Sequence, residues 1–208
     1  MAAASKGGWS KPVSPELRER LLASADYCYR NACTLVDDAE LLRQASRWPT
    51  VAALAILAEE EFGKAFMLRC CANQGRWDSA IFAALTKHSI KQALSQGARD
   101  YADFSIPNAL YADEINKLSL IRSVPSMFVS PEFLDPIRHR AHQTMTERRP
   151  DYLKQDALYV KIDKNAATVF TPSSISESQA TECLREAKRI KTVVGLMAGD
   201  PAAADAWR

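Results

Sequence analysis

A continuous helical pattern of apolar residues, running from Val51 to Cys71, constrains the fold of this chain more than any other feature. It contains the charged stretch Glu59-Glu60-Glu61-Phe62-Gly63-Lys64. Some of these charges fall on the helix face that normally presents hydrocarbon to the core. The residues spaced along that face are Leu54, Leu57, Ala58, Glu61, Lys64, Ala65 and Leu68. The pattern therefore predicts a core helix with ionisable groups on its buried face.

A second helical pattern follows a short break at Asn73-Gln74-Gly75-Arg76. A break of this length favours antiparallel neighbouring helices. Pairing the two helices about the break places Lys64 opposite His88, and Glu61 opposite Lys91. We therefore predict that four ionisable groups meet at one level between these helices.

Two interpretations of this charged cluster remain open. It could be a structural ion-pair network, because buried charges must be paired and Glu–Lys pairs at this spacing are common on helices. It could instead be a functional site. Charges in an apolar stripe are costly unless they are well paired, and perturbed ionisable groups concentrate at functional sites.

Composition narrows the class of protein. The 208 residues suit one large domain or two small ones, and contents of 47% hydrophobic and 25% charged residues are typical of globular proteins. A formal net charge of +2 is too small to indicate nucleic-acid binding by itself. No apolar run approaches the roughly 20 residues of a membrane span, and residues 1–11 lack the apolar core of a secretory signal. We predict a cytoplasmic protein without a membrane partner.

The cysteines give no sign of a disulfide framework or a metal site. There are five, an odd number without ligand spacing: Cys28, Cys33, Cys70, Cys71 and Cys183. Such cysteines are typical of reduced thiols in the cytoplasm. We predict no metal and no other cofactor.

Local signals predict an all-α bundle. Ser14-Pro15-Glu16 and Ser130-Pro131-Glu132 each have the N-cap, proline and early acid of a helix start. Ser174 with Glu177 fits a capping box before a last helix that ends near Met197. Two further helices are predicted over about 49–72 and 77–101. The predicted organisation is a disordered tail at 1–13, a single helical domain at 14–199 and a C-terminal tail at 200–208.

Two further segments complete the prediction. Residues 158–162 alternate apolar and polar side chains, and turn residues separate them from a second short run, which predicts one small β-hairpin near residues 158–171. The most basic local run lies at 138–142. It is either a solvated basic face or a face that contacts phosphates, and its candidate RNA-binding residues are Arg138, Arg140 and His142.

The charged motifs resemble a known family. Residues 52–65, with Glu60, Glu61, Gly63 and Lys64, look like the helix signature of AbiV-type abortive infection proteins of the HEPN superfamily. His88 and Lys91 match the family's His-x-x-Lys on the following helix. The segment from Lys154 to Val160 resembles the family's lysine followed by a Tyr-Val strand, and Pro172 also falls in place. The resemblance covers about residues 15–195.

The resemblance implies a HEPN-like helical bundle, often dimeric, with a role in antiphage defence. Many HEPN domains are metal-independent ribonucleases whose usual signature is Arg, four to six residues, then His. No histidine of this chain has an arginine at that distance upstream. Either the AbiV-type residues do the work, or the domain binds a partner without cutting RNA.

The enzyme interpretation assigns RNA cleavage to the candidate catalytic residues Glu60, Glu61, Lys64, His88 and Lys91. His88 would move a proton, the lysines would stabilise phosphate charge and the glutamates would orient those cations. The alternative is a non-catalytic helical module that binds a phage or host protein. We also predict a symmetric homodimer, because a two-fold axis would supply a second histidine to the site.

Overall fold

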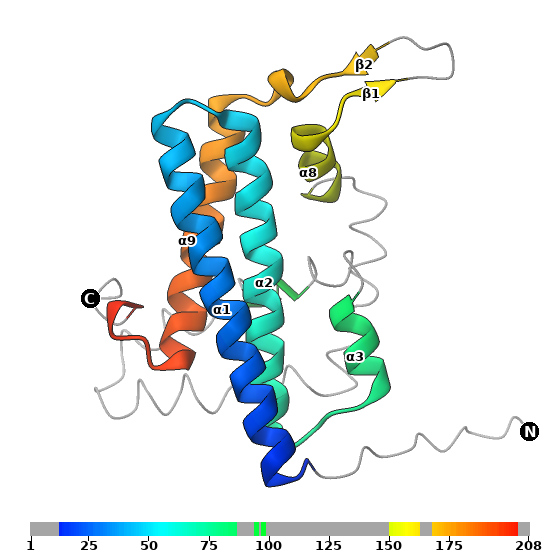
Figure 1. Cartoon of the computed structure of the whole chain (residues 1–208), viewed down its shortest axis with the longest axis vertical. Coiled ribbons are helices and arrows are strands. Elements are labelled where there is room, and N and C mark those ends of the chain that lie inside the picture. The colour runs from blue at the N-terminus through cyan, green and yellow to red at the C-terminus, as the bar shows by residue number, and fades with distance from the viewer. Residues whose placement is uncertain (1–12, 87–93, 96, 99–149, 163–167, 204–208) are drawn as a thin grey trace, which may run out of the picture.

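The structure, a computed structural model, describes residues 13–86, 94–95, 97–98, 150–162 and 168–203. Its elements are α1 (Pro15–Gln44), α2 (Trp48–Gln74), α3 (Ser79–Thr86), α8 (Pro150–Leu158), β1 (Lys161–Ile162), β2 (Thr168–Phe170), η1 (Pro172–Ser174) and α9 (Glu177–Ala198). Helices α1, α2 and α9 lie side by side as a bundle, and the shorter elements lie on one side of it (Figure 1). The predicted helical class is confirmed.

Helix α2 is the centre of the molecule. It packs against α1, α9 and α8, and eighteen of its 27 residues are buried. Alanines recur along it and let the neighbouring helices approach closely, while Phe62 and Phe66 fill the remaining space. Because neighbours cover it on several sides, α2 is apolar around most of its circumference.

This environment corrects the predicted orientation of α2. Leu54, Leu57, Glu61 and Lys64, all assigned to the buried face, are only partly buried, whereas Glu60 on another side is 2% exposed. The prediction took the stripe containing the charges as the core-facing one. A helix surrounded by partners has no single apolar face, so periodicity alone does not identify the side that is most deeply buried.

The predicted start of α1 and the predicted break after α2 are confirmed. Ser14 caps α1, and its side-chain oxygen accepts a hydrogen bond of 3.2 Å from the backbone N–H of Leu17. Helix α2 stops at Gly75, whose φ of 64° is the left-handed conformation that favours glycine. The backbone N–H of Val13 donates a 3.1 Å hydrogen bond to the carbonyl of Gly75. Val13, the last residue of the predicted tail, is therefore tied to the end of α2.

The capping box of α9 lies two residues beyond its predicted place. Ser176 accepts a 3.2 Å hydrogen bond from the N–H of Gln179, and the Gln179 side chain accepts a 2.9 Å bond from the N–H of Ser176. The predicted pair of Ser174 and Glu177 was therefore wrong. Ser174 instead ends the short helix η1, and both serine-initiated spacings satisfy the same sequence rule.

Strands β1 and β2 form a short antiparallel pair, with Lys161 opposite Phe170. Both strands fall within the range of the predicted hairpin. Residues 163–167, which would form its turn, lie outside the described residues, so the complete hairpin stays a prediction. The helix predicted to begin at Ser130 also lies outside the described residues.

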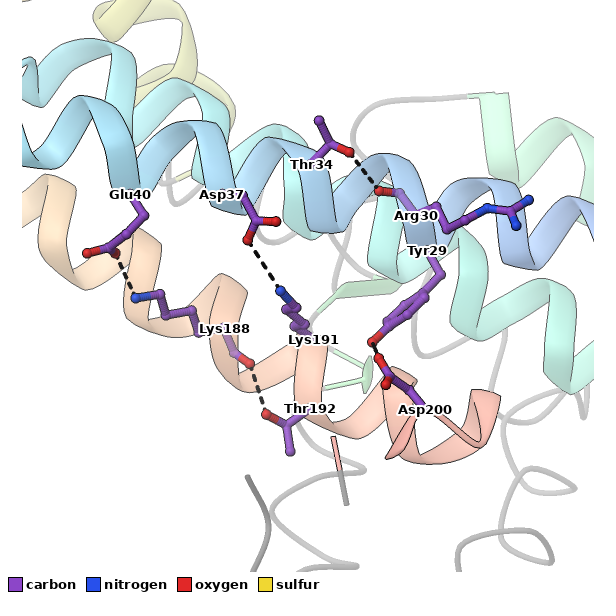
Figure 2. Close-up of polar contacts among 9 residues, drawn as sticks. All are labelled: Tyr29, Arg30, Thr34, Asp37, Glu40, Lys188, Lys191, Thr192 and Asp200. Carbon is purple, nitrogen blue, oxygen red and sulfur yellow. Dashed lines mark hydrogen bonds and ion pairs between the residues drawn. The ribbon is translucent and has the colours of Figure 1, made fainter. Parts of the chain in front are cut away.

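Apolar contacts hold α9 on the bundle, and ion pairs flank them. The buried residues of α9 recur every three or four positions: Ala180, Leu184, Ala187, Ile190 and Val194. Lys188 lies 2.7 Å from Glu40, and Lys191 lies 3.5 Å from Asp37, both across the seam with α1 (Figure 2). Such exposed pairs typically contribute less than about 1 kcal/mol each, so the buried face dominates the attachment.

A hydrogen bond from Tyr29 anchors the segment that follows α9. The Tyr29 hydroxyl donates a 2.6 Å bond to Asp200 Oδ2 (Figure 2). The centroid of the Tyr29 ring lies 5.7 Å from that of Phe62. Burial raises the pKa of Tyr29, and the hydrogen bond from Tyr29 lowers the pKa of Asp200. Ala203 is 6% exposed. The first residues of the predicted C-terminal tail therefore pack against the bundle.

None of the helices in the described ranges combines the length and the apolar composition that crossing a membrane requires. All five cysteines are free thiols, as predicted. Cys70 and Cys71 are buried, and burial raises the pKa of Cys71 to about 12.

Candidate functional site

Three consecutive glutamates in the middle of α2 point in different directions. Successive residues of a helix are about 100° apart, so three of them cannot share a face. Glu59 is 6% exposed and Glu60 is 2% exposed, whereas the Glu61 side chain keeps 20% of its surface. One turn of α2 therefore carries two buried acidic residues and one that reaches solvent.

Glu60 forms a buried ion pair with α8. Lys154 Nζ donates a 2.6 Å hydrogen bond to Glu60 Oε1, and the two side chains keep 9% and 3% of their surface. The partners are 94 residues apart in the chain. Ionised carboxylate and ammonium groups this deeply buried are stable only as partners, because each alone would lose its hydration without compensation.

Glu61 forms a second ion pair, within α2 itself. Its partner is Lys64, one turn later, and the lysine side chain keeps 21% of its surface. The pairing is the ordinary one between residues three positions apart on a helix. The predicted proximity of Glu61 and Lys64 is therefore observed, but their predicted partners His88 and Lys91 lie outside the described residues.

The chain beyond α3 returns to the level of this acidic turn. Ser95 is 1% exposed and its hydroxyl donates a 2.7 Å hydrogen bond to the backbone carbonyl of Glu59. Leu94 and Ala98 are buried with it. This contact ties Ser95 to α2, and the predicted pairing of His88 and Lys91 stays a prediction.

Lys154 is the residue of this cluster that sequence reasoning missed. The family resemblance includes this lysine but gives it no role. One signal was present: Leu153 and Ala157 flank it at helical spacing, and both pack against the core. A lysine between such residues is a candidate for a buried cation.

The cluster combines opposite charges at two depths. The Glu60–Lys154 pair is sealed between α2 and α8, and the Glu61–Lys64 pair lies beside it, where solvent has access. The exposed pair supplies a cation that can meet an anionic ligand, and the buried pair fixes two helices around it. The candidate RNA-binding residues Arg138, Arg140 and His142 lie outside the described residues.

Comparison with known proteins identifies the chain at the level of its family. The HEPN_AbiV family, described as AbiV, matches residues 20–192 and so includes all the site residues discussed above. Neither a search of curated proteins nor a search of solved structures gave a match. The matched segment spans most of α1, all of α2 and α8, and most of α9. The chain therefore belongs to the AbiV family of HEPN domains.

Proposed function

We propose that this protein is an antiphage abortive-infection effector that acts on RNA as a metal-independent endoribonuclease of the HEPN type. The observation that carries the proposal is the acidic turn of α2, with two ion pairs within one helical turn. Charges at the centre of a buried helix are costly unless they are paired, and ionisable groups in such places often mark functional sites.

The proposed reaction uses the RNA's own 2′-hydroxyl as the nucleophile. The hydroxyl gives its proton to a base, and its oxygen bonds to phosphorus. The bond from phosphorus to the 5′-oxygen then breaks as that oxygen takes up a proton. The products are a 2′,3′-cyclic phosphate and a 5′-hydroxyl.

The residues have separate roles in this reaction. His88 moves the proton, because an imidazole ordinarily titrates near neutrality. Lys64 and Lys91 stabilise the extra charge on the phosphate oxygens in the transition state. Glu61 orients Lys64, with which it is paired. Glu60 also orients a cation, from the buried side of the same turn.

The first test is RNA cleavage by the purified protein. We expect degradation of total RNA that is unchanged by a chelator, and loss of cleavage in His88→Ala at an unchanged melting temperature. Arg138→Ala, on the basic run, is the comparison variant. Full activity in His88→Ala together with loss in Arg138→Ala would move the site to the basic run.

Glu61→Gln provides a cleaner second test than any change at Glu60. Lys64 is partly exposed, so removing its partner does not strand a buried charge. Loss of one such helix pair costs only about 0.2–0.5 kcal/mol of stability. A large loss of cleavage in Glu61→Gln would therefore report on the site, whereas wild-type cleavage would exclude Glu61 from it.

A second candidate function is a non-catalytic module that binds a phage or host protein. It is favoured by the α8–β1 patch, which we define as Tyr152, Leu158, Tyr159 and Val160, exposed by 42%, 45%, 63% and 54%. Large apolar side chains gathered on a surface commonly mark a protein interface.

Charge introduced into this patch separates the two functions. If binding is the function, Tyr159→Asp should abolish phage protection while purified wild-type protein leaves RNA intact. Tyr27→Asp is the matched control, since Tyr27 is 68% exposed on α1, outside the patch. Protection that survives Tyr159→Asp would count against the binding function.

We further propose that the protein acts in the cytoplasm as a symmetric homodimer. A two-fold axis would bring a second copy of each site residue, including a second histidine for the acid and base roles. Light scattering at micromolar concentration should give twice the chain mass of 23.1 kDa. A monomeric mass under these conditions would contradict the dimer.

A further inference from the structure

We infer that Lys154 is a positioning residue that holds the Glu60 carboxylate in place, so that α8 is part of the site rather than an appendage. This inference rests on the proposed function, because it assigns a role within that site. It begins from the 2.6 Å bond between Lys154 and Glu60, which links two segments far apart in sequence.

The position of Lys154 on α8 argues against a purely structural role. Lys154 and Ala157 are three residues apart and both are buried, so the lysine occupies the face by which this short helix packs on α2. An apolar side chain of similar length would fill the same space without the desolvation of two charges. Replacing a buried ion pair by packed hydrocarbon is often neutral or stabilising. Stability alone therefore gives little reason for a lysine here.

The direction of the bond explains what the lysine does. Glu60 lies between Glu59 and Glu61 in sequence, but its carboxylate oxygen Oε1 is paired with Lys154 on α8. An ammonium group fixed by its own helix holds that carboxylate in one rotamer. Glu60 and Glu61 belong to the same turn of α2, so an error in one is transmitted to the neighbouring Glu61–Lys64 pair. Misplacement of a site group by about 1 Å can cost roughly 100-fold in rate.

The α8 helix is well placed for this role. It contacts α2 and η1, and η1 in turn contacts α2, so α8 is supported from two directions. Lys154 itself is too deeply buried to reach a substrate, which makes it a positioning residue rather than one that touches RNA.

The experiment removes both charges together, because removing one would take a buried ion-pair partner from the other. Glu60→Leu combined with Lys154→Met should give a folded protein with a cooperative melt and a kcat for RNA cleavage lower by about 100-fold. KM should change little, since neither side chain reaches the substrate. The single variant Lys154→Arg keeps the charge, so its kcat should lie between that of the double variant and that of the wild type. Lys161→Met is the matched control, since Lys161 pairs with Asp156 beside this region and is more exposed.

Each outcome decides the inference. A double variant that folds and cleaves at the wild-type rate would overturn it. If the double variant does not fold, Lys154→Arg decides: a tenfold lower kcat at an unchanged melting temperature supports positioning, and a wild-type kcat overturns it. If wild-type protein cleaves no RNA, the proposed function fails separately. The same variants are then scored by phage plating, where full protection by a folded double variant overturns the inference.

Discussion

Gly195→Ala should destabilise the protein, although it replaces a glycine inside a helix. On helix propensity alone, the change would stabilise α9 by about 1 kcal/mol. The surroundings reverse the sign: a Cβ at Gly195 would lie 2.6 Å from the Tyr29 hydroxyl oxygen and 2.6 Å from the Ala203 Cβ. The tyrosine has little room to retreat, because its ring packs against Phe62 and it is only 8% exposed.

The magnitude follows from two costs and one gain. Overpacking typically costs about 1–3 kcal/mol, and weakening the charge-assisted bond from Tyr29 to Asp200 costs up to about 1.5–3 kcal/mol. After subtraction of the gain in helix propensity, we expect a net loss of about 2–4 kcal/mol. Urea unfolding followed by circular dichroism at constant m-value would measure it.

The same variant in a Tyr29→Phe background tests the cause. Without the hydroxyl, the nearest atom of that ring is at 3.4 Å, an ordinary contact. The cost of Gly195→Ala should therefore fall by about 1–2 kcal/mol in the Tyr29→Phe background, as a coupling between touching residues. A Gly195→Ala protein as stable as the wild type would refute the close approach at Gly195, and equal costs in both backgrounds would refute the part assigned to the Tyr29 hydroxyl.

Three further changes test other parts of the fold. The hydrogen bond from Arg43, with that from Lys188, lowers the pKa of Glu40 from its ordinary 4.5 to about 2, so its contribution is full above pH 4.5 and is lost as pH falls toward 2. In Glu40→Gln this loss of unfolding free energy at low pH, which is below about 1 kcal/mol at such a surface site, should disappear. Urea unfolding from pH 6 to pH 2 would measure it, and the same pH dependence as in the wild type would contradict it. Ser14→Ala should cost about 1 kcal/mol by removing the cap of α1, with no loss arguing against the cap. Phe62→Ala should cost about 3–5 kcal/mol in the same assay, because the ring is fully buried, and a cost below 1 kcal/mol would refute its place in the core.

Local chemistry was enough to predict where α1 begins and where α2 ends. Ser14 and Gly75 act through their own neighbours, so their roles are legible in a few residues of sequence. The capping box at Ser176 shows the limit of this approach, because Ser174 satisfied the same spacing rule. Where a local rule fits two nearby positions, the packing of the preceding segment determines which of them caps the helix.

The candidate site depended on tertiary contacts and was predicted only in part. The acidic turn and the Glu61–Lys64 pair are properties of one helix, and sequence spacing is sufficient for them. The deeper pair of Glu60 and Lys154 joins segments 94 residues apart, and no spacing rule connects them. The side of α2 that faces solvent was likewise misjudged, since that depends on which helices surround it.

The all-round burial of α2 has a consequence for how the protein is made. On the ribosome, α1 can cover one side of α2 at once, but α9 begins at Glu177, about a hundred residues after α2 ends at Gln74. At synthesis rates of about 5–20 residues per second, the side of α2 that packs against α9 stays uncovered for about 5–20 s. During that time the growing chain displays the part of the apolar α2 surface that α9 covers in the folded protein. Synthesis of this protein should therefore depend on chaperones that bind hydrophobic segments until the final helix emerges.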